Sequence, residues 1–270
     1  MDNTLHNDEI TRHLGPHPWA AQVQIFEEVE STNTLLKSLG HQGAPQGPVL
    51  IAARQSAGRG RLGRTFLSPG GVGVYLSVLI RPQCPPAQIM HLTCAVAVAM
   101  CDAVEAACGL RPQIKWTNDL VLGARKLGGI LTELSLNPQT QLVDWAVIGI
   151  GINCCQSEED FDPSIRSMAT SLQLATGHPV ARGGLAAEMI RALHHMSENL
   201  LSDKALTMAQ YARDCITIGK EIQVIRGGSI RPGKAVGIDL DGGLMVCYAD
   251  GSRETVSSGE VSIRGMYGYV

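Results

Sequence analysis

The stretch ILTELSLNPQTQLVDWAVIGIGIN, residues 130–153, decides the fold of this chain. Its two apolar runs, 130–136 and 144–152, flank Asn137-Pro138, which predicts two strands joined by a turn. Further strands are expected on the N-terminal side, at 23–29, 49–53, 74–80 and 113–116. Helices are expected at 34–39, after capping side chains at 31–33, at 89–109 and at 185–200. The sequence therefore predicts a sheet flanked by helices.

The sequence changes character from Gly219 onward. Short β-rich runs at 221–225, 234–238, 244–247 and 253–257 are separated by Gly-Gly, Asp-Gly-Gly and Asp-Gly turns. This alternation is typical of a small antiparallel barrel, with a domain boundary near 215–219. At the other end, Gly and Pro residues predict an irregular extension over residues 1–20, and 155–182 is expected to be mostly loop with a short helix.

Composition and charge exclude several classes of protein. The chain has 270 residues, 44% of them hydrophobic, which is enough to bury a sizeable core. A net charge of -3 excludes a basic field over the whole chain, although it leaves a local basic patch open. The most apolar stretch, 94–108, contains Asp102 and Glu105 and is shorter than the ~20 residues of a membrane span. With no signal peptide pattern at the N-terminus, we expect a cytoplasmic protein that binds neither membrane nor nucleic acid.

The eight cysteines do not form a metal-binding pattern. None lies in C-x-x-C spacing, and Cys94, Cys101 and Cys108 are seven residues apart, on one face of the expected helix. Buried thiols are favoured over metal ligands. His194-His195 has no Glu in H-E-x-x-H spacing, which argues against a zinc site there as well.

The loop of residues 54–64, RQSAGRGRLGR, carries four arginines and three glycines. Glycine lets the backbone approach a ligand closely, and guanidinium groups match carboxylates and phosphates, so the loop predicts an anionic ligand. A solvated basic loop is the alternative. The spacing Gly58-x-Gly60-x-x-Gly63 also matches a dinucleotide fingerprint, but a Ser-Pro-Gly-Gly segment and a strand follow where a helix is required. The chain also lacks a P-loop motif.

Two further segments carry candidate chemistry. Lys115-Trp-Thr-Asn-Asp119 is followed by Lys126-Leu-Gly-Gly129, and charged groups between apolar strands favour a bound anion over the alternative, an exposed hairpin tip. In Gly149-Ile-Gly-Ile-Asn153, two glycines either open one strand face to a flat ligand or mark close packing.

Together these segments resemble the biotin protein ligase family, from about Val23 to the C-terminus. Four ordered motifs carry the resemblance: Glu30-Ser-Thr-Asn33, Gln55 with Gly58-Arg-Gly-Arg61, Lys115-Trp-x-Asn-Asp119 with Arg125-Lys-Leu-Gly-Gly-Ile-Leu131, and Gly149-x-Gly-x-Asn153. The resemblance implies an α+β fold: a mixed sheet with flanking helices, as in class II synthetases, followed by an SH3-like barrel. It also implies that biotin and ATP react to biotinyl-5'-adenylate, and that the biotinyl group passes to a lysine of a biotin carboxyl carrier domain of acetyl-CoA carboxylase or a related carboxylase.

The resemblance also assigns roles to residues of this sequence. Three would be catalytic: Lys126, Arg61 and Asp119, the last facing the incoming carrier lysine. The biotin contacts would be Ser31, Thr32, Asn33, Gln55, Arg59, Gly60, Arg61, Leu62, Lys126, Gly128, Gly149 and Gly151. The ATP contacts would be Arg61, Arg64, Phe66, Lys115, Asn118, Lys126 and Asn153. Mg²⁺ is expected with ATP, without a direct protein ligand.

Two positions depart from the family pattern, since Thr117 replaces a usual proline and Phe66 stands where tryptophan is expected beside the adenine. Only about 22 residues precede the first expected strand, too few for the N-terminal DNA-binding domain of some members. We therefore expect a ligase without that domain, divided into an extension (1–22), a catalytic domain (23–217) and a barrel (218–270). A lipoate or octanoate ligase and a non-catalytic biotin-binding regulator are the alternatives.

Overall fold

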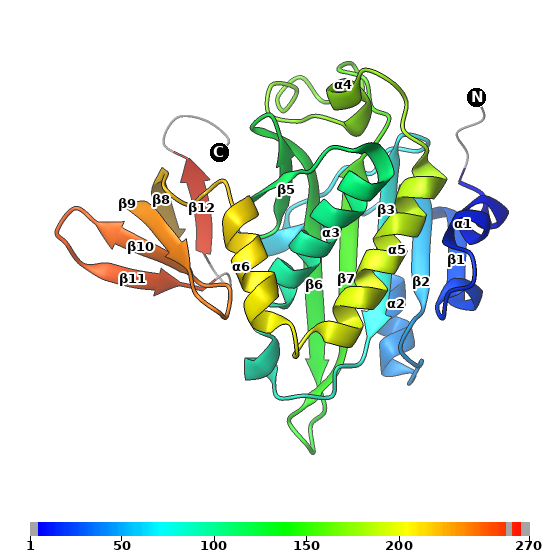
Figure 1. Ribbon diagram of the computed structural model, residues 1–270, viewed down its shortest axis with the longest axis horizontal. Coiled ribbons are helices and arrows are strands. Elements are labelled where there is room, and N and C mark those ends of the chain that lie inside the picture. The colour runs from blue at the N-terminus through cyan, green and yellow to red at the C-terminus, as the bar shows by residue number, and fades with distance from the viewer. Residues whose placement is uncertain (1–4, 258–260, 266–270) are drawn as a thin grey trace.

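The computed structural model describes residues 5–257 and 261–265. Within these residues the chain forms a seven-stranded mixed sheet, a five-stranded antiparallel sheet and six α-helices (Figure 1). The strands of the large sheet are β1 (Val23–Val29), β2 (Val49–Gln55), β3 (Gly73–Ile80), β4 (Gln113–Lys115), β5 (Asp119–Leu122), β6 (Arg125–Leu136) and β7 (Val143–Asn153). The helices are α1 (Asn7–Leu14), α2 (Thr32–His41), α3 (Leu92–Cys108), α4 (Leu172–Thr176), α5 (Arg182–Asn199) and α6 (Lys204–Asp214).

The large sheet has the order β1-β2-β3-β7-β6-β5-β4. Only the pair β1–β2 is parallel, with α2 as its connection, and the remaining neighbours are antiparallel. The mixed sheet expected from the sequence is therefore confirmed, and its two longest strands are the pair around Asn137-Pro138. In the centre of the sheet, Gly149 lies between Ser77 of β3 and Leu131 of β6.

Helix α3 is the core helix of the fold. It packs with α5 against one face of the large sheet (Figure 1), and its segment Pro86–Cys108 is apolar and long enough to cross a membrane by length and composition. However, 72% of its most apolar window is buried within the protein, as expected of a core helix. Burial raises the pKa of the Cys94 thiol to about 12, so this cysteine is a neutral, buried group at neutral pH.

The N-terminal segment differs from the sequence prediction. Residues 7–14 form helix α1, which packs on α5 through the buried side chains Ile10 and Leu14, so the expectation of an irregular segment over residues 1–20 was wrong for this part. Asp8 in the first turn and His13 in the last suit the helix dipole. Two apolar residues four apart are too short a signal to predict such a helix without its partner.

Helix α2 also begins two residues earlier than predicted. Ser31 precedes the first turn with an extended backbone but makes no side-chain cap, which corrects the expected capping role of this segment. Thr32 and Asn33 lie in the first turn, and their side chains face the large sheet. The helix therefore delivers polar groups to the sheet surface beside Gly149.

The second sheet has the order β11-β10-β9-β8-β12, formed by β8 (Glu221–Arg226), β9 (Ser229–Ile238), β10 (Leu244–Tyr248), β11 (Arg253–Val256) and β12 (Val261–Gly265). It contacts the first through Trp116, whose indole nitrogen donates to the carbonyl of Gly242 at 2.9 Å and whose backbone nitrogen donates to Thr217 at 2.9 Å. Helix α6, which the sequence did not reveal, holds the same segment because Tyr211 donates to the carbonyl of Thr117 at 3.1 Å.

Candidate active site

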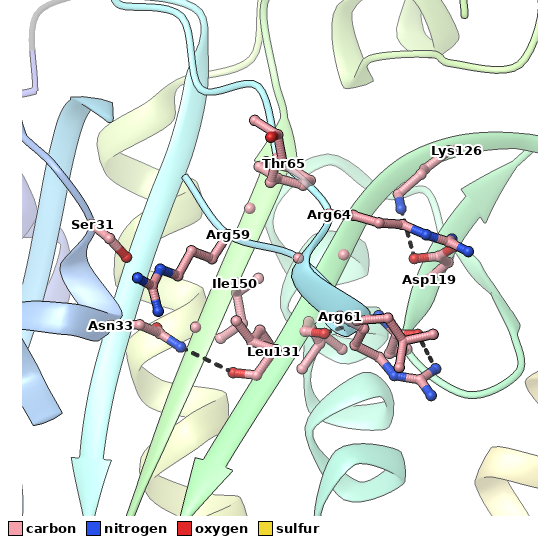
Figure 2. A pocket seen from close by; sticks show the side chains of 18 of the residues that line it. Ser31, Asn33, Arg59, Arg61, Arg64, Thr65, Asp119, Lys126, Leu131 and Ile150 are labelled. Atoms are coloured by element: carbon pink, nitrogen blue, oxygen red, sulfur yellow. Dashed lines mark hydrogen bonds and ion pairs between the residues drawn. The ribbon is translucent and has the colours of Figure 1, made fainter. Parts of the chain in front are cut away.

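A cavity of about 620 Å³ lies on the α2 side of the large sheet. It is bounded by the first turn of α2, the loop after β2, the β5–β6 hairpin and the centre of the sheet. Figure 2 shows Ser31 and Asn33 at one end and Lys126, Asp119 and Arg64 at the other. One elongated cavity therefore has a polar end, where Arg59 lies with Ser31 and Asn33, and an end where several charged groups gather.

The structure brings most of the predicted residues to this cavity. Those on its wall are Ser31, Thr32, Asn33, Gln55, Arg59, Gly60, Arg61, Leu62, Arg64, Phe66, Lys115, Asn118, Asp119, Lys126, Gly149 and Gly151. They come from segments spread over more than a hundred residues of sequence, and only the fold places them together.

Two predicted residues do not lie on the cavity wall. Gly128 instead packs against the β7 backbone, where an added Cβ would collide with the carbonyl of Gly151. The Asn153 side chain donates to the carbonyl of Thr170 at 3.0 Å and accepts from Gln156 at 3.1 Å, so its polar atoms serve the loop that follows β7. The ligand contacts expected of Gly128 and Asn153 remain predictions.

The polar end is a hydrogen-bonded network of buried side chains. Thr32 Oγ1 lies 2.6 Å from Ser77 Oγ, which in turn lies 2.6 Å from Asn33 Oδ1. The side-chain oxygen of Gln55, Oε1, accepts from the backbone nitrogen of Thr32 at 2.9 Å, and Gln55 Nε2 donates to Ser68 Oγ at 3.0 Å. Such a network holds its members in fixed orientations.

The charged end contains the three predicted catalytic residues. Lys126 Nζ lies 2.8 Å from Asp119 Oδ1 across the β5–β6 hairpin, and Arg61 donates to Asn118 Oδ1 at 3.1 Å (Figure 2). Burial lowers the pKa of Arg61 while the Asp119 carboxylate opposes that shift, and the guanidinium remains charged at any physiological pH. Two cations and one carboxylate therefore surround the space where an anionic group would lie.

The Gly/Arg loop folds over the cavity as a short hairpin. Gly60 N donates to the carbonyl of Arg64 at 2.7 Å, and Phe66 N donates to the carbonyl of Gly58 at 2.9 Å. Leu62 has a left-handed backbone conformation, φ 56°, at the tip of the loop. This tip places Arg61 over the charged end of the cavity.

The glycines of β7 allow close approach to the strand. A Cβ on Gly149 would collide with the amide of Asn33, and one on Gly151 would collide with the ring of Phe66. Both glycines also line the cavity. Of the two interpretations left open by the sequence, close packing is confirmed, whereas a strand face open to a flat ligand remains a prediction.

Several wall residues were given no role by the sequence analysis. They are Thr65, Ser77, Trp116, Gly129, Ile130, Leu131, Ile150, Met168 and Gln223. Ser77 had a usable signal, since it is the one serine within the apolar run of β3. Gln223 had none, because it belongs to β8 of the second sheet and its approach depends on how the two sheets pack.

The cavity offers few ligands to a metal ion. Among the residues that the structure describes, no group of three or more His, Cys, Asp or Glu could hold a metal. Asp119 is paired with Lys126. Because Mg²⁺ commonly binds through substrate phosphates with one or two carboxylates, these residues fit a metal that is held mainly by a nucleotide.

Comparison with known proteins agrees with this architecture. Residues 25–153 match the model of the biotin/lipoate A/B protein ligase family, and residues 217–264 match that of the biotin protein ligase C-terminal domain. The biotin--[acetyl-CoA-carboxylase] ligase of Mycobacterium tuberculosis is 31% identical over 89% of this chain and 88% of its own length. The bifunctional ligase/repressor BirA of Bacillus subtilis is 33% identical over 87% of this chain and 72% of its own length.

A solved structure gives the same result at the level of the fold. The biotin protein ligase of Aquifex aeolicus in complex with biotin and ATP superposes with a TM-score of 0.75 and 27% identity, over 90% of this chain and 99% of that one. Both sheets of the present structure are included in a match of that extent. The chain therefore belongs to the biotin/lipoate A/B protein ligase family, as a member of its biotin protein ligases.

Proposed function

We propose that this protein is an ATP-dependent ligase that activates biotin as biotinyl-5'-AMP and transfers the biotinyl group to a lysine of a biotin carboxyl carrier domain. The observation that carries the proposal is the single cavity, in which a polar end with uncharged hydrogen-bonding side chains and an end with Lys126, Arg61 and Asp119 lie on one face of the sheet. Biotin has a polar ring system at one end and a carboxylate at the other. The cavity matches that division.

The charged end suits the adenylation step. Joining a carboxylate to the α-phosphate brings two anions together, so catalysis depends on positioning and on neutralising charge. In our proposal Lys126 and Arg61 contact the oxygens on which negative charge develops. The loop that carries Arg61 would also shield the mixed anhydride from water.

The ATP contacts of the proposal lie along the same end of the cavity. Lys115, Asn118 and Arg64 would contact the nucleotide, and the ring of Phe66 would pack beside the adenine. Mg²⁺ would neutralise phosphate charge when it is bound with ATP.

The second step needs a neutral amine as nucleophile. Asp119, which lies 2.8 Å from Lys126, would orient the carrier lysine and accept its proton during attack on the biotinyl carbonyl. Relatives named as acetyl-CoA-carboxylase ligases support a carboxylase carrier domain as partner. We place the reaction in the cytoplasm.

Pyrophosphate exchange tests the proposal directly. The wild-type protein should exchange labelled pyrophosphate into ATP when biotin is present, and neither lipoate nor octanoate should replace biotin. Exchange with lipoate or octanoate would support the alternative acyl ligase. Biotin binding without any exchange would support a non-catalytic regulator.

A further inference from the structure

The donor and acceptor directions of the hydrogen bonds at the polar end are set by two residues that lie outside the cavity. Glu133 of β6 accepts from Asn33 Nδ2 at 2.9 Å and from Lys37 Nζ at 2.7 Å. Neither Glu133 nor Lys37 lines the cavity. The pair nevertheless contacts the first turn of α2, where the polar network begins.

The hydrogen-bonding chemistry of these groups fixes the orientation of the Asn33 side-chain amide. A carboxylate paired with an ammonium group only accepts hydrogen bonds, so Asn33 must turn its nitrogen toward Glu133. The oxygen of that amide then faces Ser77 and lies against Gly149. An amide oxygen only accepts, so Ser77 donates its one proton to Asn33.

The same reasoning passes on to Thr32. Since the Ser77 proton is used, Ser77 Oγ can only accept from Thr32 Oγ1 at 2.6 Å. On the other side, Ser68 donates to the carbonyl of Phe66, so Gln55 turns its nitrogen to Ser68 and its oxygen to Thr32. Both neighbours of the Thr32 hydroxyl are therefore acceptors.

The cavity consequently presents lone pairs at its polar end. The oxygens of Asn33, Ser77, Thr32 and Gln55 all belong to wall residues, and the Thr32 hydroxyl proton is shared between Ser77 and Gln55. Ser31 and Arg59 lie on the same wall and can donate to a ligand oxygen. A ligand that pairs with the oxygens of this network must bring hydrogen-bond donors. The two ureido N–H groups of biotin are such donors, whereas a dithiolane ring or an alkyl chain has none.

We propose that Glu133 is the positioning residue that selects a donor-bearing ligand, through the amide of Asn33. This inference rests on the proposed function, because it explains how the biotin site tells a ureido ring from the rings and chains of other acids. The carbonyl of Leu131 also accepts from Asn33 Nδ2, but at 3.4 Å that contact is longer than the 2.9 Å to Glu133. Without the carboxylate, the Asn33 amide can therefore turn over and place its NH₂ against the ligand. A site built to pair with a substrate N–H is sensitive to such an inversion.

The sharpest variant keeps the shape of Glu133 and inverts its polarity. In Glu133→Gln, the ammonium of Lys37 only donates and captures the new amide oxygen, which leaves the NH₂ group facing Asn33. The Asn33 amide then turns its oxygen toward residue 133, and the polar end acquires a donor. We expect the dissociation constant of biotin to rise at least about tenfold, while the KM for ATP in pyrophosphate exchange stays unchanged.

The double variant Lys37→Met with Glu133→Gln is the decisive comparison. Once the ammonium is gone, the introduced glutamine can turn its oxygen back to Asn33, so biotin affinity should return to within about threefold of wild type. Lys37→Met alone should also stay within about threefold, since the carboxylate still accepts from Asn33. Both variants that carry Glu133→Gln lack the ion pair, so a merely structural role predicts equal losses.

Calorimetric titration with biotin and thermal unfolding would be measured on all four proteins. Rescue by Lys37→Met supports the inference. Equal weakening in the single Glu133→Gln and the double variant, or no weakening in either, overturns it. Failure of the wild-type protein to bind biotin would instead overturn the proposed function, so the two failures are distinguishable.

Discussion

At the scale of single residues, Lys126 has the largest part in the proposed adenylation chemistry. Its ammonium lies 2.8 Å from the Asp119 carboxylate, on a strand where Gly129 leaves it open to the cavity. Lys126→Met keeps most of the apolar stem and removes the charge. We expect adenylate formation to fall at least about a hundredfold, the scale of losing an oxyanion-hole donor.

The transfer step should separate this role from a structural one. With pre-formed biotinyl-adenylate, transfer by Lys126→Met should fall much less, because the phosphate chemistry is already complete. Lys204→Met is a matched control, since Lys204 pairs with Asp241 and neither residue lines the cavity. If adenylation survives in Lys126→Met, Lys126 is only a surface charge, and the role given to its motif must be withdrawn.

The residues of the site show what sequence can and cannot predict. Arg61, Lys126 and Gly149 lie in motifs whose chemistry is visible in the chain, and all three line the cavity. Glu133 could not be found this way, because it lies in an ordinary alternating strand and acts through Asn33 of another element. Contacts between distant segments are a property of the fold.

At the scale of elements, the Gly/Arg loop is the part of the site with the most arginines. Its base is held by Ser56 and Ala57, which donate to the carbonyls of Val29 and Glu30, while Arg59 and Arg64 are exposed. We expect residues 56–66 to open in the free protein, because their like charges repel until an anion is bound.

Limited proteolysis checks that expectation. Trypsin should cut the free protein at Arg59, Arg61 or Arg64, and biotinyl-adenylate should protect these bonds. Cleavage at other sites in the same digest, followed by mass spectrometry, serves as the internal control. Equal cutting with and without the adenylate would show that the loop does not close on it.

Helix α3 gives a prediction about pH. His91 precedes its first turn, is fully buried, and bonds the carbonyl of Leu200 through Nε2 at 2.9 Å. Burial lowers the pKa of His91 below its usual 6.5, so the unfolded chain takes up its proton first. The stability that neutral His91 contributes is therefore present above about pH 6.5 and is lost as the pH falls through that value.

Urea unfolding at several pH values measures this contribution. We expect the free energy of unfolding of the wild type to fall between about pH 7 and pH 5. In His91→Gln, which can still donate to Leu200 and does not titrate, the decrease should be smaller. An identical pH dependence in both proteins would show that His91 does not contribute to the loss of stability.

The helices and strands that were predicted, and those that were missed, show why the prediction from sequence was only partial. The strands and the core helix were predictable because their apolar patterns are long, as in β3 and α3. Helices α1 and α6 were missed because each buries only a few side chains, such as Leu14 and Tyr211, against partners far away in sequence. Short amphipathic helices depend on tertiary packing for most of their stability.

At the scale of the whole molecule, the two sheets share one site. The mixed sheet was expected from the sequence, as was a C-terminal antiparallel β-domain, which was predicted as a small SH3-like barrel and is described here as a five-stranded sheet. The division at 217/218 remains a prediction. Trp116, within the Lys115–Asp119 motif, bonds to Gly242 in the turn between β9 and β10. Removing the C-terminal sheet would therefore disturb the catalytic motif itself, and a single substitution is a cleaner test of what this sheet contributes.

Gln223 is the position for that test. It is the one wall residue contributed by the second sheet within the described residues, and β8 follows the segment in which Ile216 donates to the carbonyl of Ile114. Gln223 shares the cavity wall with Lys115, which is on the proposed ATP side. We expect Gln223→Ala to raise the KM for ATP in pyrophosphate exchange about three- to tenfold, as for loss of one or two hydrogen bonds. The KM for biotin should not change, because Gln223 has no part in the polar network of Thr32, Asn33, Gln55 and Ser77. Gln210→Ala, which removes a hydrogen bond to Asp102 away from the cavity wall, is the matched control.

Two outcomes would contradict this role of Gln223. A change in the KM for biotin alone would place Gln223 at the biotin site instead of the ATP site. No change in the KM for either substrate would mean that the second sheet assists only by supporting Trp116.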